Sequence, residues 1–178
     1  MKIWSLYGFI LLGLIFALFF VRLILPSQVD DVNPLMNCSE EVLDLADVYF
    51  VVPKFSGVEI EGKWCEEIKK RVSSSGWRLG IGDLRSGKKE LALHGVYHSY
   101  NEFGVFRDEE YFEEGVRVFQ DCFGFVPKRF KPGQLVFCEE NSWIRERMDV
   151  ELFWNQLFHK VYHCGDSGRF PNWFIRIF

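Results

Sequence analysis

The stretch Leu91-Ala92-Leu93-His94-Gly95-Val96-Tyr97-His98-Ser99 places two imidazoles four residues apart, directly behind a short apolar run. An apolar run that stops at a glycine is typical of a buried strand. If a helical turn follows, side chains at positions i and i+4 lie on one face. The pattern therefore predicts a strand that delivers His94 and a pair of histidines able to bind one metal ion, although the isolated motif also occurs by chance.

Two adjacent carboxylates, Asp30 and Asp31, end another short apolar segment, Val29-Asp30-Asp31-Val32-Asn33-Pro34. Like charges side by side are unfavourable unless they are solvated or bound to a cation. Catalytic zinc commonly takes three protein ligands from histidine and carboxylate and leaves one position for water. One of these aspartates with His94 and His98 would supply that ligand set, which leaves the second aspartate for proton transfer.

The N-terminal segment has the composition of a membrane anchor. Residues 3–21 contain no charged side chain, and with residues 23–25 the apolar stretch reaches about the 20 residues that cross a bilayer as a helix. Arg22, near its end, can extend to the membrane surface. A cleaved signal peptide has a shorter apolar region and a small-residue cleavage site, which fits less well. We expect a single-pass anchor over residues 1–25 and one domain over residues 26–178.

Charge and cysteine content bear on partners and compartment. The net charge of -4 and the absence of a basic block argue against nucleic acid as a partner. Lys2 and the terminal amine on one side of the anchor, against Arg22 on the other, favour a domain outside the cytoplasm by a small margin. The five cysteines form no Cys-x-x-Cys pair, so their number establishes no disulfide framework. We expect most of them to be small buried hydrophobic residues.

The rest of the chain alternates strand and helix patterns. We expect strands at residues 27–32, 48–52, 90–93, 135–138, 157–163 and 173–178, and helices at residues 40–45, 63–76, 108–123 and 141–148. This alternation indicates an α/β domain with parallel strand pairing. In such folds the reacting residues lie at the C-terminal ends of the strands. Asp30, Asp31 and His94 each end an expected strand, so we expect them at the same edge of the sheet.

The ordered set of motifs resembles the polysaccharide deacetylase superfamily, and most closely its relatives of uncharacterised function that begin with an Asp-Asp-x-x-Pro segment. The resemblance covers residues 29–137 and rests, in order, on Asp30-Asp31, Val51-Val52-Pro53, Leu93-His94-Gly95-Val96-Tyr97-His98-Ser99, Phe123-Gly124-Phe125-Val126-Pro127 and Phe130-Lys131-Pro132. It implies a distorted or incomplete (β/α) barrel behind one transmembrane helix. It also implies metal-dependent removal of N-acetyl groups from a carbohydrate.

The resemblance also implies roles for individual residues at the proposed metal site. Asp31, His94 and His98 would bind a divalent metal, with Zn²⁺ as the expected ion, and Asp30 would be the general base. His163 resembles the late histidine that protonates the leaving amine in the family.

Other positions leave alternatives open. His159 lies close to His163 in the sequence and could serve as the acid instead. Lys131 and Pro132 fall where many members have an arginine followed by two prolines, so they are candidates for contacts with the base or the substrate. Lysine lacks the rigid two-pronged donor geometry of arginine. This departure bears on how well the base would be oriented.

Three functions are therefore compared. The first is a membrane-anchored, metal-dependent deacetylase acting on a surface or lipid-linked carbohydrate, since the short link from the anchor to Asp30 would keep the site near the bilayer. The second is a non-catalytic, membrane-anchored glycan-binding or scaffolding domain of the same fold, which Lys131 favours. In the third, the histidines and aspartates are structural groups only. Metal content separates the third from the others, and an amidase assay separates the first from the second.

Overall fold

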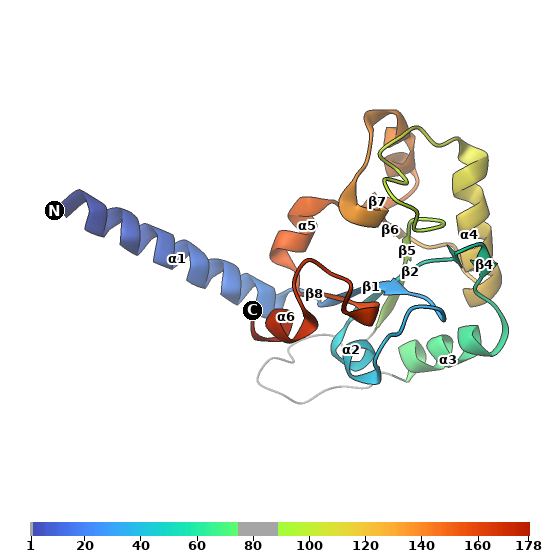
Figure 1. Cartoon of the computed structure of the whole chain (residues 1–178), viewed down its shortest axis with the longest axis horizontal. Helices are drawn as coiled ribbons and strands as arrows, with labels where there is room; N and C mark the ends of the chain where they lie inside the picture. The colour runs from blue at the N-terminus through green and yellow to red at the C-terminus, as the bar shows by residue number, and fades with distance from the viewer. Residues whose placement is uncertain (1, 75–88) are drawn as a thin grey trace.

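A long N-terminal helix, α1 (Lys2–Ile24), leads into an α/β domain (Figure 1). The computed structural model describes residues 2–74 and 89–178. Within these ranges, six strands form one sheet in the order β7-β6-β5-β2-β1-β8, and every neighbouring pair is parallel. The strands are β1 (Gln28–Val32), β2 (Val48–Val51), β5 (Glu90–His94), β6 (Arg129–Lys131), β7 (Asp149–Val150) and β8 (Val161–His163). The predicted parallel α/β architecture is confirmed.

Helices connect the strands. They are α2 (Glu40–Leu45), α3 (Gly62–Ser73), α4 (Glu109–Phe123), α5 (Phe153–Phe158) and α6 (Asn172–Ile177), with the 3₁₀ helices η1 (Gly133–Leu135), η2 (Glu139–Glu146) and η3 (Cys164–Asp166). A small antiparallel hairpin of β3 (Lys54–Phe55) and β4 (Val58–Glu59) stands where a plain loop was expected. Helix α1 ends four residues before β1 begins, so the domain starts almost at the end of α1.

The strand order advances in one direction around the sheet. From β1 the order runs through β2, β5, β6 and β7, while β8 returns to the other side of β1. The two edge strands, β7 and β8, do not pair with each other within the described residues. The structure therefore contains an open parallel sheet with the strand sequence of a barrel, and a closed barrel is not formed by this part of the chain.

The two faces of the sheet differ in chemistry, because successive strand residues point to opposite sides. One face joins the main hydrophobic core with the helices, and its strand residues include Val29, Tyr49, Val51, Leu91 and Leu93. The other face carries a small apolar cluster of Val48, Phe50 and Ala92. Strands β1, β5 and β6 also carry four buried polar side chains: Gln28, Asp30, His94 and Lys131. The polar chemistry is thus concentrated away from the main core.

The helix α4 follows its sequence pattern closely. Its buried face includes Phe112, Val116 and Phe119, as the four-residue spacing predicts. The Asp108 side chain accepts a hydrogen bond from the Tyr111 amide at 2.9 Å and caps the first turn. Gly124, in the left-handed region at φ 83°, ends the helix.

Several expected elements differ at the end of the chain. Residues 173–178 belong mainly to the helix α6 rather than to a strand, since Pro171 precedes its first turn and Ile175 packs into the core. The expected strand at 157–163 is divided between the end of α5 and β8. Tertiary packing outweighs the strand propensity of these aromatic residues.

The segment around residues 129–148 also differs. The paired strand is β6, which precedes Pro132, whereas residues 135–138 contain the end of a 3₁₀ turn and unpaired chain. The helix expected at 141–148 is the 3₁₀ helix η2. Gly76, expected to end α3, and the strand considered at 77–81 lie outside the described residues.

Disulfides correct the expectation that most cysteines are simple buried residues. All five cysteines lie in the described ranges, and four of them form the pairs Cys38–Cys164 and Cys65–Cys122, which leaves Cys138 free. The first pair joins the segments that follow β1 and β8, and the second joins α3 to α4. Their sequence separations of 126 and 57 residues explain why no local motif predicts them.

We predict that replacing Cys38 and Cys164 together with serine lowers the free energy of unfolding by about 2–5 kcal/mol, because this bridge restricts the unfolded chain over a long loop. Thermal unfolding of the full chain in lipid nanodiscs would measure the change. Cys138→Ser is the matched control and should leave the melting temperature unchanged. Equal melting temperatures for all three proteins would contradict a stabilising disulfide.

Candidate metal centre

An irregularity in β1 brings two adjacent carboxylates to one place. Val29 lies opposite Tyr49 of β2 and Val32 lies opposite Val51, so Asp30 and Asp31 together span the position of one residue on β2. Asp31 adopts a left-handed conformation at φ 64°. In a regular strand the two side chains would point to opposite faces of the sheet. This β-bulge lets both of them serve the site at the end of β1.

Three side chains converge beside this bulge. Oδ1 of Asp31 lies 3.2 Å from Nε2 of His94 and 2.8 Å from Nε2 of His98. One ligand atom from each residue lies within 4.8 Å of the others. Asp31 and His94 are buried, while His98 is partly exposed. The structure therefore brings together the three residues expected to bind a metal.

The hydrogen bonds behind these atoms suit a divalent cation. Nδ1 of His94 lies 3.0 Å from the main-chain carbonyl oxygen of Lys131. A carbonyl only accepts, so Nδ1 carries a proton, and Nε2 is the nitrogen that could bind a metal. The Ser167 hydroxyl donates to Oδ2 of Asp31 at 2.8 Å. One carboxylate oxygen and two imidazole nitrogens form a donor set that zinc and related ions prefer.

The loop that carries His98 is held by a carboxylate that sequence patterns did not indicate. Glu102 is fully buried. It accepts hydrogen bonds from the amides of Val96 at 3.1 Å, Tyr97 at 2.7 Å and His98 at 3.2 Å, and from the Tyr111 hydroxyl at 2.6 Å. The sequence around Glu102 does not distinguish a buried glutamate from a solvated one, so no local pattern reveals this role.

This loop is not the helical turn expected from the i, i+4 spacing. Gly95 and His98 both have positive φ, at 59° and 55°. A Cβ on Gly95 would lie 2.3 Å from Oε2 of Glu102, so the carboxylate occupies the space that the glycine leaves. The two imidazole centroids come within 5.0 Å through this bent loop.

Asp30 is held by a buried cation. The Lys131 ammonium donates to Oδ1 of Asp30 at 2.7 Å and to Oε1 of Gln28 at 2.6 Å, and it lies 3.9 Å from the ring centroid of Phe50. The Lys131 side chain is fully buried. Pro132 is buried beside it and precedes η1. The lysine therefore orients the aspartate through a single ammonium, where an arginine would offer two parallel donors.

Behind Lys131, a chain of side chains of alternating charge continues from Gln28. Nε2 of Gln28 donates to Oε2 of Glu151 at 2.9 Å, and Glu151 pairs with Arg129. Arg129 also contacts Glu90 at 3.0 Å. Buried charges are stable only when they are paired in this way.

Of the two late histidines, only His163 lies at the site. Its Nε2 is 3.8 Å from Oδ2 of Asp30, and its Nδ1 has no hydrogen-bond partner among the described residues. Asn172 fixes its main chain by accepting from the His163 amide at 3.0 Å and donating to its carbonyl at 2.8 Å. His159 instead places Nδ1 2.7 Å from the carbonyl oxygen of Pro26, at the start of the domain.

Electrostatics couple Asp31 to its two histidines. Burial raises the pKa of Asp31, but hydrogen bonds and charges from His94 and His98 outweigh burial and lower this pKa below its usual range. Burial also lowers the pKa of His98, and the hydrogen bond and charge of Asp31 raise it above its usual value by more. Without a metal, a proton on His98 therefore stabilises the cluster.

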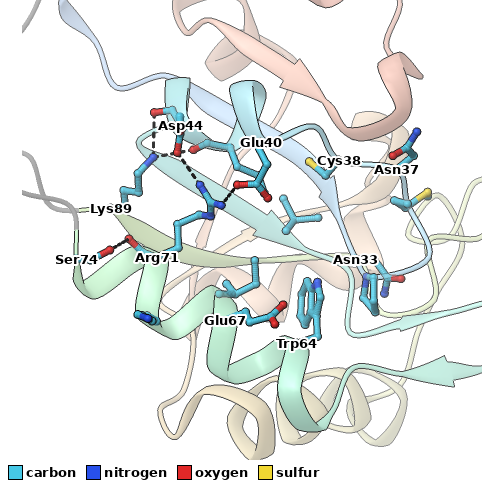
Figure 2. Close-up of a pocket in the computed structure, with 16 residues that line it drawn as sticks. Asn33, Asn37, Cys38, Glu40, Asp44, Trp64, Glu67, Arg71, Ser74 and Lys89 are labelled. Atoms are coloured by element: carbon cyan, nitrogen blue, oxygen red, sulfur yellow. Dashed lines mark hydrogen bonds and ion pairs between the residues drawn. The ribbon is translucent and has the colours of Figure 1, made fainter.

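A separate groove lies between α2, α3 and the segment after β1 (Figure 2). Its volume is about 900 Å³. Arg71 pairs with Glu40 and with Asp44 along one side, and Trp64 lies at the other end. None of the three candidate metal ligands lines it. Arg71, Glu40 and Asp44 are thus engaged with one another, apart from the candidate metal centre.

Comparisons with known proteins add little to what the geometry of the site indicates about function. No family model and no curated protein matches the chain. A similar solved structure is the Xyl-CE4 domain of a multidomain xylanase from the hindgut metagenome of Trinervitermes trinervoides, with 14% sequence identity and a TM-score of 0.44. The match covers 71% of this chain and 55% of that one, so the chain spans about half the length of that structure.

We predict that Glu102→Gln weakens zinc binding by about 10- to 100-fold, a typical effect of losing a group that positions a ligand. The amide donors of the His98 loop would then meet a neutral acceptor that also presents an NH₂ group. Titration with zinc would measure the affinity. The exposed Glu146 provides the control Glu146→Gln, which should bind as the wild type does, and equal affinities in both variants would refute the positioning role.

Zinc affinity should fall as the pH is lowered through the raised pKa of His98, because the metal must displace the proton from this imidazole. Below that pKa the dissociation constant should rise about tenfold per pH unit for each proton released. Zinc titrations between about pH 5.5 and 8.5 would show the slope. The control variant His159→Asn should show the same dependence of zinc affinity on pH. A zinc affinity that does not change with pH would be inconsistent with His98 as a ligand.

Proposed function

We propose that the chain is a metal-dependent hydrolase that removes N-acetyl groups from a carbohydrate. The arrangement that carries the proposal is the Asp31, His94 and His98 cluster beside a second carboxylate, Asp30, with the imidazole of His163 near it. Amide hydrolysis needs an electrophile, a base for water and an acid for the leaving nitrogen. Each requirement has a candidate group here. The carbohydrate class and the incomplete barrel come from the motif resemblance.

A divalent cation on Asp31, His94 and His98 would polarise the amide carbonyl and lower the pKa of water at the site. The protein fixes the positions of the three groups that would hold this cation. Ser167 and the Lys131 carbonyl fix the orientation of Asp31 and His94, and Glu102 fixes the loop of His98. Such partners keep ligands in position through a catalytic cycle.

Asp30 is the proposed general base. Lys131 holds Oδ1, which leaves Oδ2 directed toward His163 and toward Gln156, whose Nε2 lies 3.3 Å away. As the water oxygen bonds to the carbonyl carbon, Oδ2 accepts the proton that water releases.

His163 is the proposed general acid. As the C–N bond breaks, the imidazolium gives its proton to the nitrogen, and the products are acetate and a free amine. The proton on Asp30 can then return to His163 through one bridging water, since Nε2 of His163 lies 3.8 Å from Oδ2 of Asp30. The cycle thus restores both groups without another reactant.

The proposed setting is a membrane surface outside the cytoplasm. The segment Tyr7–Ile24 of α1 is long and apolar enough to span a bilayer. Two disulfides favour an oxidising compartment, in agreement with an outward-facing domain. β1 runs away from the end of α1, so the bulge lies beyond the end of the anchor rather than beside it (Figure 1). The site would therefore lie close to the membrane yet face away from it, which favours a surface glycan over a sugar on a lipid.

A non-catalytic glycan-binding domain is the second candidate. Lys131 holds one oxygen of Asp30 through a single ammonium rather than the two-pronged donor of an arginine, so the base is less rigidly oriented. Metal would still bind to Asp31, His94 and His98 in that case. Turnover separates the two functions.

We predict about one equivalent of zinc in the full chain, and loss of this metal in His94→Ala and Asp31→Asn. Asp30→Asn should retain the metal and lose about 10²- to 10⁴-fold in deacetylation of N-acetylated oligosaccharides, since it removes the base. Metal analysis and acetate release would measure both properties. Undiminished acetate release by Asp30→Asn would refute the base, and no release by a metal-loaded wild type would favour the binding domain.

Two histidine variants test the acid. His163→Asn should lose amide hydrolysis but keep most of its activity on an activated aryl acetate, whose leaving group needs no proton. His159→Asn is the matched control and should keep both activities. The reverse result, with the loss in His159→Asn, would transfer the acid role to that residue.

A further inference from the structure

Exposed aromatic side chains gather on the two short helices α5 and α6. Trp154 and Trp173 are 68% and 65% exposed. The other large exposed apolar residues on and beside these helices are Phe153, Phe158, Phe170, Ile177 and Phe178. Apolar clusters of this kind on a protein surface commonly mark a contact with a partner or a membrane.

Both helices adjoin the end of α1, on the side of the domain from which α1 extends (Figure 1). The ring of Phe178 lies edge-on to Phe19 of α1, with their centroids 6.4 Å apart. The Arg22 guanidinium donates to the Leu157 carbonyl of α5 at 3.2 Å. The last turns of α1 are thus packed against the exposed aromatic helices.

These contacts indicate how deep in the bilayer the aromatic helices would lie. An apolar span over residues 3–21 is about 28 Å long as a helix, close to the hydrocarbon thickness of a bilayer. Arg22 would then lie at the headgroups, and Phe19 just inside the hydrocarbon. Phe178, beside Phe19, would share that depth. The aromatic helices therefore reach the layer where α1 leaves the membrane.

The residue types fit this layer. Tryptophan combines a large apolar ring with one N–H donor, and it is enriched at membrane interfaces for this reason. Ile175 faces the protein core from α6, whereas Trp173 and Ile177 are exposed. The helix therefore has one side for the domain and another that is available to lipid.

We propose that α5 and α6 form a membrane-surface platform that lies in the headgroup layer of the bilayer crossed by α1. The occupant of the aromatic surface is the lipid itself, because the surface is continuous with the end of the anchor helix. The platform rests on the anchor proposed above. It would hold the domain in one orientation, with the C-terminal ends of the strands and the metal centre directed away from the bilayer.

Tryptophan fluorescence of the full chain in nanodiscs tests the platform. The chain has six tryptophans, so single-tryptophan proteins can be made by replacing the other five with phenylalanine. Proteins retaining only Trp154 or only Trp173 should lose most of their emission in lipids brominated near the headgroup. The protein retaining only Trp64 is the control, since this residue lines the groove between α2 and α3, and it should keep its emission (Figure 2).

The protein retaining only Trp4, within α1, reports on the anchor separately. Quenching of Trp4 without quenching of Trp154 and Trp173 would overturn the platform and leave the anchor standing. No quenching at Trp4 would overturn the anchor and the platform together. Acetate release is an independent readout, so failure of the proposed hydrolase would leave the quenching result unaffected.

A milder variant guards against misfolding. In an otherwise wild-type chain, Trp154→Phe with Trp173→Phe should remove most of the emission that headgroup-brominated lipid quenches, apart from that of Trp4. Trp64→Phe is the matched control and should leave the quenched emission unchanged. The proposal fails if the double variant loses no more of the quenched emission than Trp64→Phe does. It also fails if a second copy of the chain covers the aromatic surface in a dimer and lipid does not quench its tryptophans.

Discussion

Lys131 joins the two halves of the candidate site. Its ammonium is bonded to Asp30 on β1, while its carbonyl oxygen accepts from Nδ1 of His94 and from the Gly95 amide at 2.9 Å. The side chain is removed from water, so breaking the ion pair would leave an isolated buried charge at a cost of about 3–5 kcal/mol. One residue of β6 thus holds the carboxylate of one strand and the imidazole of another in fixed relation.

Local patterns predicted the elements that present the candidate metal ligands. The strands β1 and β5 follow apolar runs, and the parallel arrangement then places Asp31 and His94 at the same edge, as expected. The helix α4 follows from its spacing and from its capping residues Asp108 and Gly124. These predictions succeeded because each depends on residues close together in the sequence.

Features that depend on distant contacts were not predictable. Glu102 and Ser167 look like surface residues in the sequence, yet each bonds to the site. The pairing of Cys38 with Cys164 depends on β8 lying beside β1. The helix α6 was mistaken for a strand because its aromatic residues suit either state and only packing decides between them. The sequence also left the proposed acid open between His159 and His163, and only the fold shows that His163 is the one beside Asp30.

The position of β8 next to β1 has a consequence for biosynthesis. Asp30 and Asp31 leave the ribosome early, whereas His163 and Ser167, which complete their surroundings, emerge more than a hundred residues later. The first strand must therefore wait with one side uncovered until the last strand inserts beside it. The Cys38–Cys164 bridge then links the segments that follow these two strands, so the candidate site is complete only after the last strand has been made.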